Sequence, residues 1–302
     1  NVVVTPGAKP IMYYAILALI EPGDEVIYPD PGFPIYESMT RFTGGTPVPY
    51  PLREENDFRF DPDELRSLVT DKTKLIIFNS PHNPTGGVLT KEDITAIADI
   101  ARERDITVMA DEIYCRGVFE GEHFSIATLP GMPERTIVLD GFSKAWAMTG
   151  WRLGFAILPK ELVDPFSKLI INSVSCTSSF EQIAAIEALN GPQDEVVRMV
   201  EEFRVRRGIV VDGLNAIFGI TCRMPHGAFY VFPNVSGTGI NGSQMADKLL
   251  NEGGVCTLSG TAFGKVGADH IRISYANSRD NLKLALERIA DTVAKIPAGT
   301  TA

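Results

Sequence analysis

The segment GFSKAWAMTGWRLG at residues 141–154 guides the interpretation of the whole chain. Its lysine, Lys144, directly follows a β-branched, strand-like run and stands among small and apolar residues. A lysine in a surface loop is the plain alternative, but solvated loops seldom contain two tryptophans. We therefore expect Lys144 to be partly desolvated, which lowers the pKa of an ammonium group toward nucleophilic use. Arg152 supplies a permanent cation that suits a phosphate group.

Strand-like and helix-like patterns alternate along the first half of the chain. The expected strands lie at residues 2–5, 25–28, 74–79, 106–110 and 136–140, and helical patterns lie between them. This alternation predicts an α/β fold with a mostly parallel sheet covered by helices on both faces.

After Arg152 the pattern changes to longer helices and isolated strands. Helices are expected at residues 161–171, 180–189, 193–218, 244–252 and 281–294, and strands at 228–232 and 270–275. We predict a large domain at residues 1–205 and a smaller α+β C-terminal domain at residues 206–302, with the boundary inside the long helix.

Composition excludes several classes of function. The chain has 302 residues, 44% of them hydrophobic, which is enough for a sizeable core. Its net charge of −10 disfavours nucleic-acid and anionic-membrane partners, yet allows a small anion in a local pocket. The longest apolar run, residues 11–20, is shorter than the roughly 20 residues of a membrane span. Scattered cysteines and histidines predict free thiols in a reducing cytoplasm and no metal site.

Residues 141–154 resemble the lysine signature of the class I/II aminotransferases, enzymes of fold type I that depend on pyridoxal 5'-phosphate. The family's other landmarks follow in family order from Asn1 to the C-terminus. The resemblance implies that Lys144 forms the Schiff base with the cofactor. It also implies that Lys144 shuttles the proton between the substrate Cα and the cofactor C4′.

Two further segments carry residues that the resemblance assigns to the cofactor ring. Asp111 ends a strand, where a carboxylate faces the ligand crevice of an open α/β sheet, although a helix N-cap is the alternative. The resemblance implies that Asp111 pairs with the pyridinium nitrogen and that Tyr114 donates to the phenolic oxygen. Asn83, in NSPHNPTG at residues 79–86, is implied for the same oxygen and for the edge of the substrate carboxylate, unless this segment is only a turn.

The segment TPGAKP at residues 5–10 joins a strand to a helix, and small residues there let helix N-terminal amides approach a phosphate. The resemblance places the cofactor phosphate at this turn, with support from the lysine signature. The implied phosphate-binding residues are Gly7, Ala8, Lys9, Ser143 and Arg152. Many relatives carry a hydroxyl three residues before the lysine, where this chain has Gly141. One phosphate hydrogen bond must then come from elsewhere or from water.

The remaining landmarks concern the ring face and the substrate. Phe33 matches the aromatic residue that stacks on the pyridine ring, and we expect Tyr36 to line the same pocket. Arg272 lies in an apolar strand and matches the arginine that binds the substrate α-carboxylate through a bidentate fork. Phe229 and Tyr230 are expected to help close the small domain over the substrate.

The implied reaction is a ping-pong aldimine/ketimine transfer of an amino group between an amino acid and a 2-oxo acid. Some relatives bind a second carboxylate through an arginine expected between Arg152 and Arg198, and this chain has none there. A subgroup of aspartate and prephenate aminotransferases uses a lysine at the position of Lys9, which favours aspartate or another acidic donor. The alternative is that Lys9 only decorates a helix N-terminus.

Three other functions stay open at this point: a lyase that catalyses β-elimination, an aromatic or alanine aminotransferase, and the aminotransferase-like domain of a transcriptional regulator. The chain starts with Asn1 and enters a strand-like run at once, so we expect a natural N-terminal segment to be missing. We expect its loss to expose apolar surface on the long helix and at residues 229–232. The family pattern also implies a homodimer with shared active sites.

Overall fold

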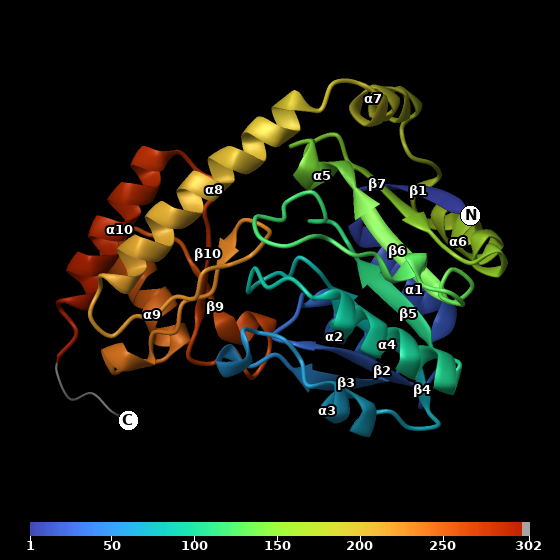
Figure 1. Ribbon diagram of the computed structural model, residues 1–302, viewed down its shortest axis with the longest axis horizontal. Coiled ribbons are helices and arrows are strands. Elements are labelled where there is room, and N and C mark those ends of the chain that lie inside the picture. The colour runs from blue at the N-terminus through green and yellow to red at the C-terminus, as the bar shows by residue number, and fades with distance from the viewer. Residues whose placement is uncertain (298–302) are drawn as a thin grey trace.

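The computed structural model describes residues 1–297 and contains a seven-stranded sheet with helices on both faces (Figure 1). The sheet order is β1 (Val2–Pro6), β7 (Leu153–Ile157), β6 (Thr136–Gly141), β5 (Thr107–Asp111), β4 (Thr73–Asn79), β2 (Glu25–Asp30) and β3 (Thr46–Pro51). Strand β7 is antiparallel to both of its neighbours, and the other pairs are parallel. The predicted α/β fold with a mostly parallel sheet is confirmed.

Each face of the sheet has its own core because neighbouring side chains of a strand point to opposite faces. Leu75 and Ile77 pack with α1 (Lys9–Leu19), α2 (Ile35–Phe42) and α6 (Lys160–Val174). Ile76 and Phe78 pack with α3 (Pro62–Ser67) and α4 (Lys91–Arg104) on the other face. Burial on both faces explains why β4 reads as a continuous apolar run.

A smaller sheet follows the long helix. Helix α7 (Ser179–Asn190) leads into α8 (Asp194–Asn215), which runs from the large sheet to α10 (Arg279–Val293) (Figure 1). The small sheet has the antiparallel order β8 (Tyr230–Val231), β10 (Ile271–Ser274) and β9 (Leu258–Ser259), and α9 (Gly242–Lys248) packs beside it. Its core joins α8, α10 and this sheet. The domain boundary at residues 205 and 206 stays a prediction.

Short helices complete the described chain: η1 (Glu54–Asn56), η2 (Ile126–Thr128), α5 (Phe142–Ala145), η3 (Ser236–Thr238), η4 (Leu249–Gly253) and η5 (Gly260–Phe263). Within residues 1–297, none of the helices combines the length and the apolar character that crossing a membrane requires.

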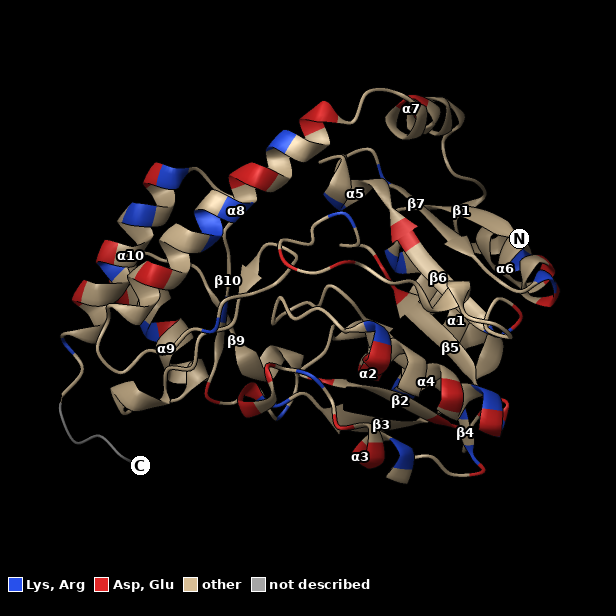
Figure 2. Ribbon diagram, viewed as in Figure 1, with Lys and Arg blue, Asp and Glu red and all other residues tan. Residues whose placement is uncertain are grey.

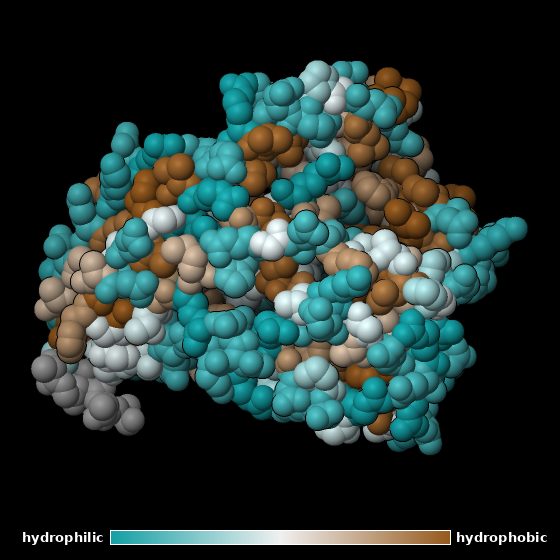
Figure 3. Space-filling view, viewed as in Figure 1, coloured by the Kyte–Doolittle hydropathy of each residue, from teal (hydrophilic) through white to brown (hydrophobic). Residues whose placement is uncertain are grey.

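The expected exposure of residues 229–232 is wrong for three of the four, and Phe229 is half-buried. Tyr230 and Val231 form β8 and are buried together with Phe232. Large apolar side chains are instead exposed on α6 and α7, in agreement with the brown surface at the upper right of Figure 3. They are Ile171, Val174, Phe180, Ile183, Ile186 and Leu189. On α8, Val197 and Val205 are exposed, as expected.

The parallel strands bring polar residues to one edge of the sheet. Asp30, Asn79 and Asp111 end β2, β4 and β5, and Lys144 follows the end of β6. Ligands of open α/β sheets bind outside the carboxyl ends of such strands. This edge is therefore where a functional site is expected.

Candidate active site

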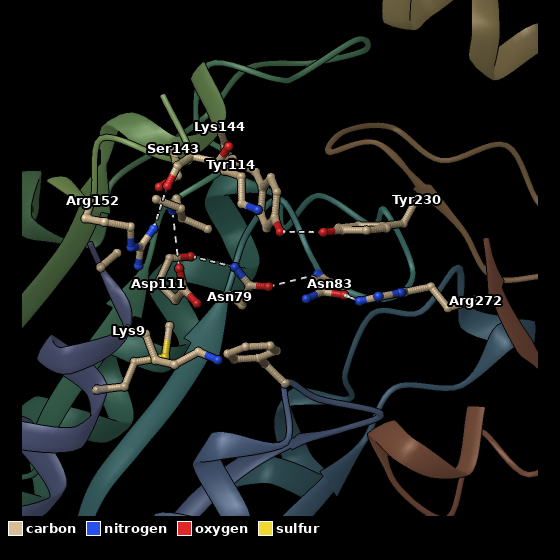
Figure 4. Close-up of a pocket in the computed structure, with 15 residues that line it drawn as sticks. Lys9, Asn79, Asn83, Asp111, Tyr114, Ser143, Lys144, Arg152, Tyr230 and Arg272 are labelled. Carbon is tan, nitrogen blue, oxygen red and sulfur yellow. Dashed lines mark hydrogen bonds between the residues drawn. The ribbon is translucent and has the colours of Figure 1, made fainter. Parts of the chain in front are cut away.

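A cavity of about 420 Å³ opens at this edge of the large sheet (Figure 4). It brings together eleven of the fourteen residues that the sequence places in or over the site, from segments far apart in sequence. These are Ala8, Lys9, Phe33, Asn83, Asp111, Tyr114, Ser143, Lys144, Arg152, Tyr230 and Arg272. Gly7 and Phe229 lie just outside its lining and are described below.

Lys144 lies on the short helix α5, with its side chain in the cavity. Its Nζ lies 5.8 Å from the ring centre of Tyr114 and 5.4 Å from that of Phe229. Burial lowers the pKa of the Lys144 ammonium group, and the positive charges of Arg272 and Arg152 lower it further. A neutral amine is thus more accessible here than on a solvated lysine, as nucleophilic and proton-transfer chemistry requires.

Asp111 carries a buried carboxylate at the floor of the cavity. It accepts hydrogen bonds from the Tyr36 hydroxyl at 2.6 Å and from the Ile113 amide at 3.2 Å. Burial raises the pKa of Asp111 to about 6, although these two bonds and the charge of Lys144 oppose the shift. Such a carboxyl gains from a cationic partner in the cavity.

The expectation that Tyr36 lines the cavity is wrong. Tyr36 is fully buried behind Asp111, and its contribution is the hydrogen bond from its hydroxyl to the carboxylate. Tyr36 follows Phe33 closely in sequence, but its depth of burial depends on the contact with Asp111 at the end of β5, which is distant in sequence.

The turn between β1 and α1 packs tightly against the arginine of the lysine signature. A Cβ atom on Gly7 would lie 2.2 Å from Nη2 of Arg152, so only glycine lets the guanidinium lie over this turn. Arg152 also donates through Nη1 to the Thr149 carbonyl at 2.8 Å. With Ala8 at the start of α1 and Ser143 on α5, this corner offers a cation, a hydroxyl and a helix N-terminus to an anion.

Gly141 and Gly154 explain how this corner is so compact. A Cβ on Gly154 would lie 2.4 Å from the Ala8 nitrogen, and a Cβ on Gly141 would lie 2.9 Å from the Leu153 carbonyl oxygen. A hydroxyl-bearing side chain at position 141 would therefore push β6 and β7 apart. The glycine found there is a consequence of close backbone packing.

The opposite wall of the cavity is built around Arg272, on the central strand of the small sheet. Arg272 donates through Nη1 to Oδ1 of Asn83 at 2.8 Å, and its guanidinium carbon lies 4.5 Å from the ring centre of Tyr230. The hydroxyls of Tyr230 and Tyr114 are hydrogen-bonded at 3.0 Å. The guanidinium fork thus stands in the cavity beside an amide and two phenols.

Asn79 also lines the cavity, although it is not among the residues predicted for the site. It pairs in register with Asp111, donates to the Asp111 carbonyl at 2.8 Å and accepts from the Asn83 amide at 2.8 Å. The same sequence pattern that points to Asp111 is present at Asn79, since both are polar residues at the end of a buried strand. Asn79 therefore connects the carboxylate floor to the turn that carries Asn83.

Phe229 lines a second, smaller apolar cavity behind Lys144, together with residues of α8. Its ring lies 5.5 Å from that of Tyr114 in an edge-to-face arrangement. Its assignment to the substrate stays a prediction.

Charge inside the cavity differs in sign from that of the chain. Among the described residues that line it, Lys9, Lys144, Arg152 and Arg272 carry positive charge, against the single acid Asp111. The chain as a whole has a net charge of −10. The cavity is thus suited to a ligand with several anionic groups.

Comparison with known proteins agrees with this geometry. A family model described as aminotransferase class I and II matches residues 1–289. The chain belongs to the class I and II aminotransferases. These transferases depend on pyridoxal phosphate and have the fold type I architecture described above.

Three relatives illustrate the similarity. An aspartate aminotransferase of Pyrococcus horikoshii is 43% identical over 292 residues, covering 96% of this chain and 74% of its own length. An aspartate/prephenate aminotransferase of Cereibacter sphaeroides is 40% identical and covers 96% of this chain and 75% of its own length. The solved structure of an aromatic aminotransferase from Pyrococcus horikoshii superimposes with a TM-score of 0.95 at 40% identity, covering 98% of this chain and 80% of its own.

The residues of the cavity fit pyridoxal phosphate. Lys144 offers an amine, Asp111 an acid that could pair with a ring nitrogen, and Phe33 an aromatic face. The corner where a Cβ on Gly7 would collide with Arg152 offers a guanidinium that suits a phosphate group. The volume of about 420 Å³ lies in the usual range of cofactor and ligand sites.

Proposed function

We propose that this aminotransferase moves an amino group between aspartate, or another acidic amino acid, and a 2-oxo acid, in two half-reactions at this cavity. The observation that carries the proposal is the set of four cations around it. Arg152 is assigned to the cofactor phosphate, Arg272 to the α-carboxylate and Lys144 to proton transfer. Lys9 then remains for a second carboxylate.

The position of Lys9 supports this assignment. Its Nζ lies 5.2 Å from the ring centre of Phe33, and its side chain extends into the cavity from the N-terminus of α1 (Figure 4). A dicarboxylate can then contact Arg272 at one end and Lys9 at the other. The relatives named aspartate and aspartate/prephenate aminotransferase are consistent with an acidic substrate.

The chain's own residues account for the other steps. When bound, pyridoxal phosphate supplies the electron sink for the carbanion. Lys144, with its lowered pKa, would take up the proton that leaves the substrate Cα and hold it on Nζ for transfer to C4′ of the cofactor. With the cofactor bound, Asp111 would hold negative charge against the ring nitrogen, and Tyr114 and Asn83 would orient the phenolic oxygen.

We further propose that the enzyme acts in the cytoplasm as a homodimer. All four cysteines are free thiols, which fits a reducing compartment. The exposed apolar residues of α6 and α7 offer a surface for a second copy.

Transfer of labelled nitrogen tests the reaction. Cofactor-loaded enzyme given ¹⁵N-aspartate and 2-oxoglutarate should yield ¹⁵N-glutamate, with the label absent from ammonium. Release of labelled ammonium from the amino acid alone would support a lyase and overturn the proposal. Faster transfer from phenylalanine than from aspartate would support an aromatic aminotransferase instead. One of the similar solved structures carries that name.

A further inference from the structure

The guanidinium of Arg272 contacts two aromatic rings, one from a strand and one from a short helix. Its guanidinium carbon lies 4.5 Å from the ring centre of Tyr230 and 4.7 Å from that of Phe263. Tyr230 belongs to the neighbouring strand β8, so the small sheet fixes its position. Phe263 ends η5 and lies outside that sheet. Besides Tyr230 and the hydrogen bond to Asn83, the direction of the guanidinium fork therefore depends on what holds Phe263.

The backbone around Phe263 is held by a turn of the large sheet. The Gly32 amide donates to the Phe263 carbonyl at 2.7 Å. Two amides a little further along the loop, those of Lys265 and Val266, donate to the two carboxylate oxygens of Asp30 at 3.1 and 3.2 Å. Asp30 is only 6% exposed, so these bonds are shielded from water.

Gly264 shows how closely Asp30 approaches this loop. Its φ of +138° favours glycine, and a Cβ there would lie 2.0 Å from Oδ1 of Asp30. The carboxylate thus occupies the space that any side chain at position 264 would need. Asp30 and Gly264 form one fitted contact between the large sheet and the loop that carries Phe263.

The same turn also carries a wall of the active site. Asp30 ends β2, and Phe33, three residues later, lines the cavity. Residues 30–33 therefore touch the site in two ways: through the ring of Phe33, and through the loop that places Phe263 against Arg272. A shift of this turn relative to the loop would change the distance between the ring-binding wall and the carboxylate-binding arginine.

We propose that Asp30 is a positioning residue, whose buried carboxylate fixes residues 264–266 and thereby sets, through Phe263, the position of Arg272. The proposal rests on the proposed function, in which Arg272 binds the substrate α-carboxylate. Asp30 itself does not line the cavity. Its effect should therefore appear in the binding of carboxylates, with cofactor binding unaffected.

The test compares holoenzyme variants in binding of maleate, an unreactive dicarboxylate, and in steady-state kinetics. Asp30→Asn keeps the size of the side chain but replaces one acceptor oxygen with an NH₂ group that faces a backbone N–H. We expect the Kd of maleate and the KM of the amino acid to rise about ten-fold, as for loss of one charge-assisted hydrogen bond. We expect kcat and cofactor affinity to stay within about two-fold, and amide exchange at Lys265 and Val266 to accelerate.

Three further variants make the result unambiguous. Asp24→Asn is the matched control, because Asp24 also accepts a backbone amide, that of Glu21, but is not part of the cavity or its loops. Gly264→Ala should reproduce the Asp30→Asn effect, since the methyl group displaces the carboxylate. Unchanged maleate affinity in Asp30→Asn, or an equal loss of cofactor and maleate affinity, would overturn the proposal. Unchanged maleate affinity in Arg272→Ala would instead overturn the proposed function.

Discussion

At the scale of single residues, burial moves the pKa values of the amine and the acid in the cavity toward each other. It lowers the pKa of Lys144 and raises that of Asp111 to about 6. Both groups lose solvation for their charged forms, and the protein compensates only in part, through Tyr36 and the Ile113 amide on Asp111. Such shifts favour proton transfer near neutral pH and reduce the stability of the cofactor-free fold.

The first prediction concerns stability and pH in the absence of cofactor. In the folded protein Asp111 has a pKa of about 6, against an ordinary 3.8. Between these pH values the folded protein therefore binds more protons at this residue than the unfolded chain does. Its ionisation therefore lowers the free energy of unfolding as pH rises from about 4 to 6, and the loss persists above 6. Asp111→Asn should be more stable than the wild type at pH 8, by up to about 3 kcal/mol.

Urea denaturation of both cofactor-free proteins at several pH values measures this difference. The gain should shrink below pH 6 and be small near pH 4. A gain of the same size at every pH would mean that the substitution acts through packing. The charge of Asp111 would then not destabilise the fold.

The second prediction assigns Lys9 to the substrate side chain. Lys9→Ala should lower kcat/KM for aspartate by roughly 30- to 1000-fold, since truncating one partner of a charge pair costs about 2–4 kcal/mol. The same variant should change kcat/KM for phenylalanine by much less. Steady-state kinetics with both amino acids provides the comparison, and equal losses would assign Lys9 to the cofactor or the fold.

At the scale of secondary-structure elements, the proposed phosphate site at Gly7, Ala8, Ser143 and Arg152 depends on three elements packed almost backbone to backbone. The start of α1 lies against β7 at Gly154, and β6 lies against β7 at Gly141. Arg152, with a φ of +53°, turns the chain into β7 and returns its guanidinium over Gly7. Small side chains at these contacts are therefore structural requirements of the cofactor site.

Gly154→Ala is the third prediction. The new methyl group would meet the Ala8 nitrogen and Cα, so it should separate α1 from β7, weaken cofactor binding at least ten-fold and cost about 1–3 kcal/mol of stability. Gly150→Ala is the matched control, because a Cβ there meets nothing within 4 Å. Cofactor titration and thermal melts of both variants test this, and equal behaviour of the two would disprove the packing argument.

The elements also show what the sequence could and could not predict. The alternation of strand-like and helix-like segments predicted five of the seven strands of the large sheet and most helices. It did so because each buried strand ends at a polar or turn residue. Strand β3 was missed because Pro47, Pro49 and Pro51 argue against a strand, and its edge position is what tolerates them. Strand β7 was missed because its partners are β1 and β6, and no local pattern reports such antiparallel pairing.

Cavity residues within the signature segments were found from sequence, and those that act through tertiary contacts were not. Lys144 and Asp111 stand in recognisable segments at the ends of strands. The hydrogen bond of Tyr36 to Asp111 and the contact of Phe263 with Arg272 join residues far apart in the chain. Spacing along one segment carries no information on such pairs.

At the scale of the whole molecule, charge and apolar surface are unevenly distributed. Acidic and basic residues alternate along α8 and α10, while α7 carries few charges (Figure 2). On α7, Phe180 is 72% and Ile183 is 67% exposed. A surface of this kind favours association with an equally apolar one.

The fourth prediction is that α7 lies in the homodimer interface. Ile183→Glu should reduce the mass measured by light scattering from that of a dimer to that of a monomer, because a charge in an apolar interface is costly to desolvate. Phe218→Glu is the control, since Phe218 is 88% exposed but lies beyond the end of α8. If the wild type were a monomer, there would be no such interface. If both variants lost the dimer, the interface could not be assigned to α7.

Identification of the lysine that holds the cofactor tests the central assignment most directly. The cofactor-loaded enzyme is reduced with borohydride, digested and analysed by mass spectrometry. The fifth prediction is that the pyridoxyl group is found on the peptide containing Lys144, and that Lys144→Ala yields no labelled peptide and no transfer of nitrogen. Lys144 is the lysine whose pKa burial and the nearby arginines lower within the cavity. A pyridoxyl group on Lys9, or on any other lysine in the native enzyme, would contradict the account of this site.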